Sequence, residues 1–518
     1  MPLRALLLIV IATVAPLTWL AEAAPAPAPA PTPAPGIKFP KGIPNRPEKI
    51  KFPPLKYEPP DPKEYRLQLA AGPVAYIASD RELPLVNLTI LVRTGDYLEP
   101  EGKEGLTDLV SYLLTAGGTK SRSAEDLEER LAFLAANLNV SVREFQATVA
   151  LNWLSKDLYE GLAMVREVLT EPRFQEDKFK LRKSQLLQAM KSRNDDSAEI
   201  ESRERSYLVY GERFFINRQT TEPSLNGITV DDLRAFHKKW FHPANFIIAI
   251  SGDIDRAAII QKLEKLFADW PFAGEKAPPV PANPQFAEPG VYLIEKDVPQ
   301  GRVSILLPGI LRDNPDLPAI RVMNDILGGG GFTSRIVNRV RSDEGLAYSA
   351  FSHVAPGTYY PGLTMAGFQS KSRTVAYATS IVIEELKRIQ DQAVSEEELN
   401  TTKRSFVDTF PRNFATKAQI VATFAQDEFT GRYAKDPNYY KTYREKIEAL
   451  TIADVQRAAK KYLDLSKLAI LVVGKEDEIL KGHPDHRVNL VELTTGKLKR
   501  VPLRDPMTMK PLPLPPAP

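Results

Sequence analysis

Residues 229–255, TVDDLRAFHKKWFHPANFIIAISGDID, are matched 222 residues further on by residues 451–477, TIADVQRAAKKYLDLSKLAILVVGKED. The two copies align without a gap, so that Asp232 corresponds to Asp454 and Gly252 to Gly474. Each copy predicts a helix, a short loop and then a buried strand with a β-branched run. A repeat this long indicates two related domains rather than a solenoid, whose repeats are about 20–50 residues long.

The seam between the domains is FAGEKAPPVPANPQFAEPG, residues 272–290, which is rich in proline and small residues, as linkers are. We expect an N-terminal domain at 64–274, a linker at 275–288, a C-terminal domain at 289–478, and a polar, proline-rich tail at 479–518. Strand-like and helix-like runs alternate within the domains. The expected fold class is therefore α+β, with two homologous domains, each a mixed β-sheet with helices packed on one side.

The N-terminus has the features of a secretory signal. Arg4 precedes a mostly apolar stretch at 6–20, which is short for a bilayer span of about 20 residues. Ala21-Glu22-Ala23 fits a small-x-small cleavage site, so we expect a signal peptide at 1–23, with an uncleaved anchor as the alternative. Residues 24–63, dominated by Pro, Ala and Lys, predict an extended linker. The expected location is periplasmic or secreted, without stable membrane insertion after cleavage.

Composition excludes several function classes. The 68 Lys+Arg against 65 Asp+Glu leave a net charge of +3, which gives no argument for nucleic-acid binding. The chain has no cysteine, so disulfides, thiolate metal sites and cysteine nucleophiles are excluded.

A polar cluster interrupts an apolar helix at residues 105–119, GLTDLVSYLLTAGGT. Asp108, Ser111 and Tyr112 are spaced i, i+3 and i+4, which places them on one side of the helix. The layout resembles the pitrilysin/insulinase family of zinc peptidases, the inverted zincins, over about residues 64–478. In that family the equivalent helix carries H-x-x-E-H, two histidines that hold zinc and a glutamate that acts as general base.

The resemblance implies that every functional position of the zinc site is replaced here. The two histidines correspond to Asp108 and Tyr112, and the glutamate to Ser111. The third zinc ligand, a glutamate after 76 intervening residues, corresponds to Ala189, next to an NDDS sequence that resembles the family's. One carboxylate does not hold a catalytic zinc, which takes three protein ligands. We therefore expect no metal and no catalytic residue in this chain.

The histidines offer no replacement site. FHKKWFH places His237 and His242 off one helical face, with no carboxylate at useful spacing. HPDH pairs His483 with His486 around Pro484 in the polar tail, where incidental surface histidines are the simpler interpretation.

The C-terminal domain retains a second feature of the family, in LGGGGFTSRIVNRVRSDEGLAYSAF. The glycines at 328–331 allow close backbone approach, and a helix carrying Arg335, Arg339 and Arg341 should follow. The resemblance implies that Arg341 and Tyr348, seven positions apart, hold the substrate near the zinc of a facing domain, and that Gly328, Gly329, Gly330 and Gly331 line the substrate. The alternative is that Arg341 caps a helix end and Tyr348 packs in the sheet.

Three functions remain open. The resemblance favours half of a clamshell, a non-catalytic subunit that shares a peptide-binding chamber with a homologous subunit bearing the zinc motif, so that zinc belongs to the partner alone. The second is a proteolytically inactive binding or scaffold protein of the same fold, since fold does not dictate activity. The third, an active peptidase with an unconventional site, is disfavoured by the replacements at the four positions.

Overall fold

The structure is a computed structural model that describes residues 49–50, 56–494 and 497–516. The expected signal peptide at 1–23 and most of the expected linker therefore lie outside the described residues. The chain divides into residues 1–56 and 57–518, and every contact reported below lies within the second part.

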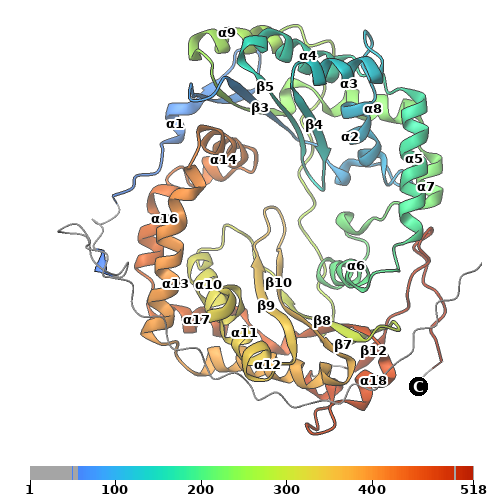
Figure 1. The fold of residues 1–518 in the computed structure, drawn as a ribbon, viewed down its shortest axis with the longest axis vertical. Helices are drawn as coiled ribbons and strands as arrows, with labels where there is room; N and C mark the ends of the chain where they lie inside the picture. The colour runs from blue at the N-terminus through green and yellow to red at the C-terminus, as the bar shows by residue number, and fades with distance from the viewer. Residues whose placement is uncertain (1–48, 51–55, 495–496, 517–518) are drawn as a thin grey trace, which may run out of the picture. The chain divides into compact units, whose positions relative to one another are not determined.

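A six-stranded mixed sheet forms the centre of the N-terminal domain (Figure 1). Its order is β1-β2-β6-β3-β5-β4, in which only β2 and β6 run parallel. The strands are β1 Arg66–Gln68, β2 Val74–Ser79, β3 Leu85–Val92, β4 Asn137–Val142, β5 Ala147–Leu154 and β6 Phe246–Gly252. β4 is one of the two edge strands of this sheet, and it pairs with β5 alone.

The C-terminal domain repeats this sheet in the order β12-β7-β11-β8-β10-β9. Its strands are β7 Gly290–Glu295, β8 Gln300–Pro308, β9 Ala347–Ala355, β10 Leu363–Lys371, β11 Ala469–Gly474 and β12 Leu498–Arg500. In this order, β7, β11, β8, β10 and β9 occupy the places that β2, β6, β3, β5 and β4 have in the first sheet. The sixth place differs, because β1 forms a hairpin with β2, whereas β12 comes from the end of the chain and runs parallel to β7.

Helices surround these sheets and pack on them or on one another. The N-terminal domain supplies α1 Pro62–Tyr65, α2 Leu106–Ala116, α3 Ala124–Phe133, α4 Leu158–Thr170, α5 Glu176–Lys191, α6 Ser197–Tyr210, α7 Glu222–Gly227, α8 Val230–Trp240 and α9 Arg256–Phe267. The C-terminal domain supplies α10 Leu317–Asn324, α11 Arg335–Val337, α12 Val375–Asp391, α13 Glu396–Thr409, α14 Lys417–Phe429, α15 Arg432–Lys435, α16 Tyr439–Glu448, α17 Ile452–Tyr462 and α18 Glu476–Lys481. No helix among the described residues has the length and apolar composition needed to cross a membrane.

The repeat predicted from the sequence is confirmed in detail. Both copies begin with a capping box, in which Thr229 or Thr451 accepts from the backbone N–H of Asp232 or Asp454, three residues on. The helices α8 and α17 then lead into β6 and β11, whose residues are all buried. The α+β class and the two related domains are therefore as expected.

The domains exchange one helix each, which the sequence did not predict. Helix α14 of the C-terminal domain packs on β6 and β2, where Phe424 joins the core that contains Ile247 and Ala249. Helix α6 of the N-terminal domain packs on β11 and β8, where Ile200 meets Leu471. Each sheet thus has its own helices on one face and a helix of the other domain on the opposite face.

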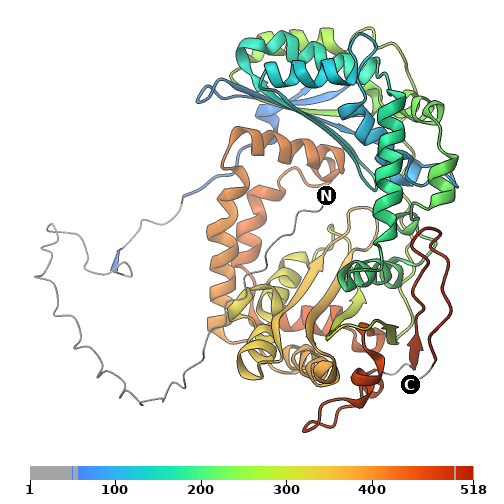
Figure 2. The ribbon, with the colours of Figure 1, turned by 45° about the vertical axis from the view of Figure 1, so that its right-hand side comes forward.

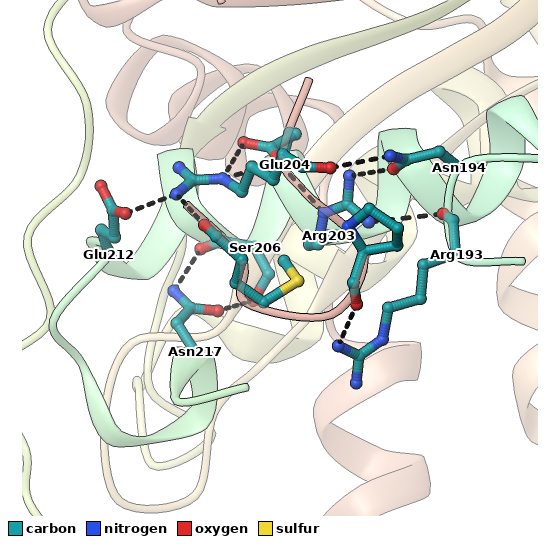
Figure 3. A network of polar contacts seen from close by, with 10 residues as sticks. Arg193, Asn194, Arg203, Glu204, Ser206, Glu212 and Asn217 are labelled. Carbon is teal, nitrogen blue, oxygen red and sulfur yellow. Dashed lines mark hydrogen bonds and ion pairs between the residues drawn. The ribbon is translucent and has the colours of Figure 1, made fainter. Parts of the chain in front are cut away.

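The predicted tail at 479–518 requires correction, because much of it is part of the fold. After α18, β12 extends the second sheet, and the segment that follows lies beside α5 and α6 (Figure 2). Arg504 donates to Glu204 at 3.1 Å and to Glu212 at 2.6 Å, and Asn194 donates to the Arg504 carbonyl at 2.7 Å. Glu204, Glu212 and Asn194 are labelled in Figure 3. Proline-rich composition suggested a spacer, but these buried polar contacts and the strand pairing fix the segment.

The end of the predicted linker at 24–63 is also fixed. The Tyr57 ring packs edge-on against Phe410, and Arg444 donates to the Tyr57 carbonyl at 3.1 Å. Asp61 caps the short helix α1. The described fold therefore includes residues from Tyr57 onward, before the expected domain start at 64.

Candidate functional site

The helix with the replaced zinc positions, α2, begins at a buried carboxylate. Glu99 accepts from the backbone N–H groups of Gly105 and Thr107, at 3.1 and 2.8 Å, and from the Thr107 hydroxyl at 2.8 Å. These are N–H groups that a helix start leaves without a partner, and a negative charge is favourable there. Burial nevertheless raises the pKa of Glu99 to about 7. This arrangement fixes the start of α2, and with it the positions of the side chains one turn further on.

An arginine lies against the first replaced position. The Arg182 guanidinium, from α5, donates to both oxygens of Asp108, with Nε–Oδ1 at 2.8 Å and Nη2–Oδ2 at 2.9 Å. The same guanidinium lies over the Tyr112 ring, 5.2 Å from its centroid. One cation therefore contacts the side chains at both positions that the resemblance aligns with the histidines of the zinc peptidases. A bidentate pair of this kind is the strongest arginine–carboxylate geometry.

The other two replaced positions offer no metal chemistry. The Ser111 hydroxyl donates to the Val140 carbonyl of β4 at 2.9 Å, while the Val140 N–H donates to the Thr115 hydroxyl at 3.0 Å. Both outward-facing backbone groups of this edge residue are thereby bound by α2. Ala189 lies exposed on α5 and has no ligand atom.

Zinc does not fit this set of donors. The only carboxylate among the four side chains, Asp108, is bound by the Arg182 guanidinium. The Tyr112 phenol has a reference pKa of about 10, and the side chains of Ser111 and Ala189 do not ligate zinc. Arg182 was not singled out from the sequence, although a signal existed. It precedes Ala189 by seven residues, two helical turns, so the two share one face of α5.

The histidines do not gather elsewhere. Among the described residues, no group of three or more His, Asp or Glu has metal-binding geometry. His237 is fully buried against Phe174, Phe241 and Phe272, and burial lowers its pKa to about 3. Of the pair at 483 and 486, the exposed His486 stacks on the Tyr377 ring, and the half-buried His483 lies tilted to the same ring with the centroids 5.6 Å apart.

The C-terminal domain brings the predicted arginine and tyrosine together and adds a third residue. The Arg341 guanidinium lies 4.8 Å from the centre of the Tyr348 ring and 4.4 Å from the centre of the Phe332 ring. Both rings are open to solvent, with Tyr348 86% and Phe332 68% exposed. Phe332 follows the glycine run directly and was not singled out from the sequence. Neither predicted alternative, a helix cap or a ring packed in the sheet, describes these side chains.

Arg341 differs from the other arginines of its segment, which continues from α11 into a π-helical turn at Asn338–Asp343. Arg335 forms a bidentate pair with Glu398, and Arg339 lies within 4 Å of three glutamates, one of them Glu385. Arg341 makes no hydrogen bond or ion pair with any residue that the structure describes. It is therefore a guanidinium held in place by two rings, with its hydrogen-bonding edge unused.

The glycine run does not belong to this stack. A Cβ on Gly328 would lie 2.4 Å from the backbone N of Ser352 on β9, so Gly328 is required for a π-helical turn, Asp325–Gly329, to pack on the sheet. Gly331 has a φ of +67°, which favours glycine. Gly328 and Gly329 line a hollow with Arg321 and His353, whereas Tyr348 lines a different one, with Gln369 and Lys371. The structure thus gives Gly328 and Gly331 backbone roles.

Two family descriptions match the chain. The insulinase family, peptidase family M16, matches residues 74–208, and the peptidase M16 inactive domain matches residues 227–406. Together they cover the greater part of both sheets and both candidate sites.

Individual relatives agree with this assignment. The chain is 24% identical over 421 residues to the non-peptidase homolog YmxG of Helicobacter pylori, covering 79% of this chain and 93% of the relative. A peptidase M16 inactive domain from Pseudomonas fluorescens has the same fold, with a TM-score of 0.70 at 24% identity over 79% of this chain and 97% of that one. The periplasmic protease PqqL of Escherichia coli gives a TM-score of 0.65 at 16% identity over 79% of this chain and 45% of that one. The sequence contains no H-x-x-E-H motif, and the chain belongs to the insulinase family of peptidases, peptidase family M16.

Proposed function

We propose that this chain is a non-catalytic subunit of a heteromeric M16 zinc peptidase. It supplies Arg341 and Tyr348 to a peptide-binding chamber, and a homologous partner supplies the zinc site. The observation that carries the proposal is the half-buried Arg341 guanidinium, which contacts two exposed rings and pairs with no carboxylate among the described residues. An arginine whose function is structural is expected to have an acidic partner, as Arg335 and Arg339 do.

The chemistry of these groups suits amide hydrolysis on a partner's site. A guanidinium binds a peptide carbonyl or carboxylate through two parallel hydrogen bonds, and stacking between rings reduces the entropy lost on binding. A phenol such as Tyr348 can donate to the oxyanion that forms when the amide carbonyl is attacked. Phe332 supplies the second ring that contacts the guanidinium.

The N-terminal domain supports the non-catalytic part of the proposal. Arg182 supplies the positive charge that faces Asp108 and Tyr112, so the helix keeps its place without a metal. We propose that the chain holds no zinc of its own and cleaves no peptide alone. The proposal includes export to the periplasm or beyond, supported by the signal-like N-terminal sequence and by the periplasmic location of one structural neighbour, PqqL.

The alternative is a scaffold protein without any part in proteolysis. Purification of the tagged chain from its native source, with mass spectrometry of what accompanies it, distinguishes the two. The proposal expects a homologue with an intact H-x-x-E-H motif in stoichiometric amount, and peptidase activity in that complex alone. A partner-free homodimer, or a complex that contains no zinc-motif homologue, would establish the scaffold instead.

A further inference from the structure

A separate cavity of about 400 Å³ lies in the C-terminal domain. It is bounded by the segment between β8 and α10 on one side and by α15 and α16 on the other; α10 and α16 are labelled in Figure 1. Its volume falls within the range of about 300–1,000 Å³ that small-ligand sites occupy. None of Phe332, Arg341 and Tyr348 lines it, so it is independent of the function proposed above.

Cationic side chains dominate its lining. Five cations face two carboxylates, as follows: Arg312, Arg321, Arg432, Lys435 and Lys446 against Asp313 and Asp436. Each carboxylate already has a lysine, with Lys435–Asp313 at 2.6 Å and Lys446–Asp436 at 3.7 Å. Of the three arginines, Arg312 lies 3.6 Å from Asp313 and Arg432 pairs with Asp427 outside the lining, whereas Arg321 pairs with no carboxylate among the described residues.

The hydrogen-bonding capacity of two of these arginines is incompletely used. The Arg312 side chain is nine-tenths buried, and its Nη2 donates to the Thr430 carbonyl at 2.8 Å. Its buried Nε has no hydrogen-bond acceptor, since the nearest carboxylate oxygen, Oδ1 of Asp313, lies 3.6 Å away. Arg321 contacts the Tyr443 hydroxyl and pairs with no carboxylate in the part of the chain that the structure describes. A buried guanidinium N–H without an acceptor is costly, and an anion in the cavity would satisfy it.

The third arginine, Arg432, is held in place on the α15 side of the cavity. Arg432 pairs with Asp427 at 3.3 Å and stacks on the Tyr439 ring, 4.5 Å from its centroid. Burial and the nearby Arg432 lower the pKa of Arg312, as expected for two cations held together. Apart from Asn314, the remainder of the lining is aromatic or aliphatic: Tyr439, Tyr443, Leu317, Pro315 and Pro318.

We infer that this cavity binds a small organic anion. A carboxylate or phosphate head lies against Arg312 and Arg321, because planar guanidinium groups recognise both heads bidentately. The apolar body of the ligand lies on Tyr439 and Tyr443. Both features are needed, since the arginines select charge and the rings select a flat or aliphatic body.

Calorimetric titration of the full chain tests the inference with four probes: phenyl phosphate, benzoate, inorganic phosphate and phenol. Phenyl phosphate, benzoate or both should bind, and the comparison of the two shows whether the cavity prefers a phosphate or a carboxylate head. Phenol, which has no charge, should not bind. Arg321→Met should weaken binding by about tenfold or more, the loss expected for a charge-assisted contact. The matched control is Arg388→Met on α12, a half-exposed arginine paired with Glu385 outside the cavity, and it should bind as the unaltered chain does.

Three outcomes would overturn the inference. The first is that neither aromatic anion binds at about 10 mM, a concentration that detects even very weak ligands. Equal affinity in Arg321→Met, with circular dichroism showing an intact fold, would remove the arginine from the site. Inorganic phosphate binding as tightly as phenyl phosphate would remove the apolar wall from it.

Discussion

Replacing Arg182 by methionine should destabilise the N-terminal domain by a small, calculable amount. Two unit charges about 2.8 Å apart attract by about 1.5 kcal/mol in bulk water. Ordering two long side chains reduces this to about 1 kcal/mol or less for partly exposed pairs, and here 28% of Arg182 and 42% of Asp108 is exposed. The stack on Tyr112 adds about 0.5 kcal/mol. The expected loss of unfolding free energy is therefore about 1–1.5 kcal/mol.

A double-mutant cycle isolates the pair. Urea unfolding of the unaltered chain, Asp108→Asn, Arg182→Met and the double variant should give a coupling energy of about 1 kcal/mol at low salt. The coupling should fall in 1 M salt, where the screening length is only about 3 Å. The matched control is Arg234→Met, which breaks the more exposed Arg234–Asp231 pair and should cost less than about 0.5 kcal/mol.

Arg182→Met should not create a zinc site, because Tyr112, Ser111 and Ala189 still provide no ligand after the guanidinium is removed. Zero coupling at low salt would show that Arg182 does not hold Asp108. Tight zinc binding by Arg182→Met, measured by metal analysis after dialysis, would show that the arginine was the only obstacle to a metal and would refute the reasoning.

Three further predictions concern stability and packing. Between pH 6.5 and pH 3, His237 is protonated in the unfolded chain but not in the folded one, so the free energy of unfolding should fall as the pH falls. The variant His237→Phe should lose up to about 2 kcal/mol less than the unaltered chain between pH 7.5 and pH 5, measured by urea unfolding. Burial raises the pKa of Glu99 to about 7, so its contribution is complete below pH 4.5 and lost as pH rises through 7; Glu99→Gln should make unfolding less sensitive to pH in that window. Arg504→Met leaves the buried Glu204 with Arg203 alone and should cost about 2–4 kcal/mol, with faster proteolysis of the C-terminal segment, whereas an unchanged cleavage rate would mean that β12 alone holds it.

The sequence was informative where chemistry is local. The capping threonines at 229 and 451 and the β-branched runs behind them specify helix and strand within about 25 residues, so the duplication and the fold class could be predicted. The seven-residue spacing of Arg341 and Tyr348 likewise placed them together, because one π-helical turn and the start of a strand connect them.

The sequence was uninformative where partners are distant. Nothing local in the sequence of α6 or α14 shows that each helix packs against the sheet of the other domain. Arg504 reaches Glu204 across 300 positions, so nothing near the chain end distinguished an anchored segment from a proline-rich spacer. The contact of Arg182 with Asp108 spans 74 positions and depends on how α5 crosses α2. Phe332 looked like an ordinary apolar residue until the fold placed it over Arg341.

The most direct test of the account is the kinetics of the reconstituted complex with changes at Arg341 and Tyr348. Tyr348→Phe removes one exposed hydroxyl and should lower kcat by about a hundredfold if that hydroxyl donates to the oxyanion. Arg341→Lys keeps the charge but loses the planar guanidinium, so it should also impair activity. The control is Arg339→Lys at a neighbouring arginine, which keeps a cation near Glu385 and should change activity little. Gel filtration should show intact complexes throughout. Full activity in both the Arg341 and Tyr348 variants would contradict the account and leave this chain as a scaffold.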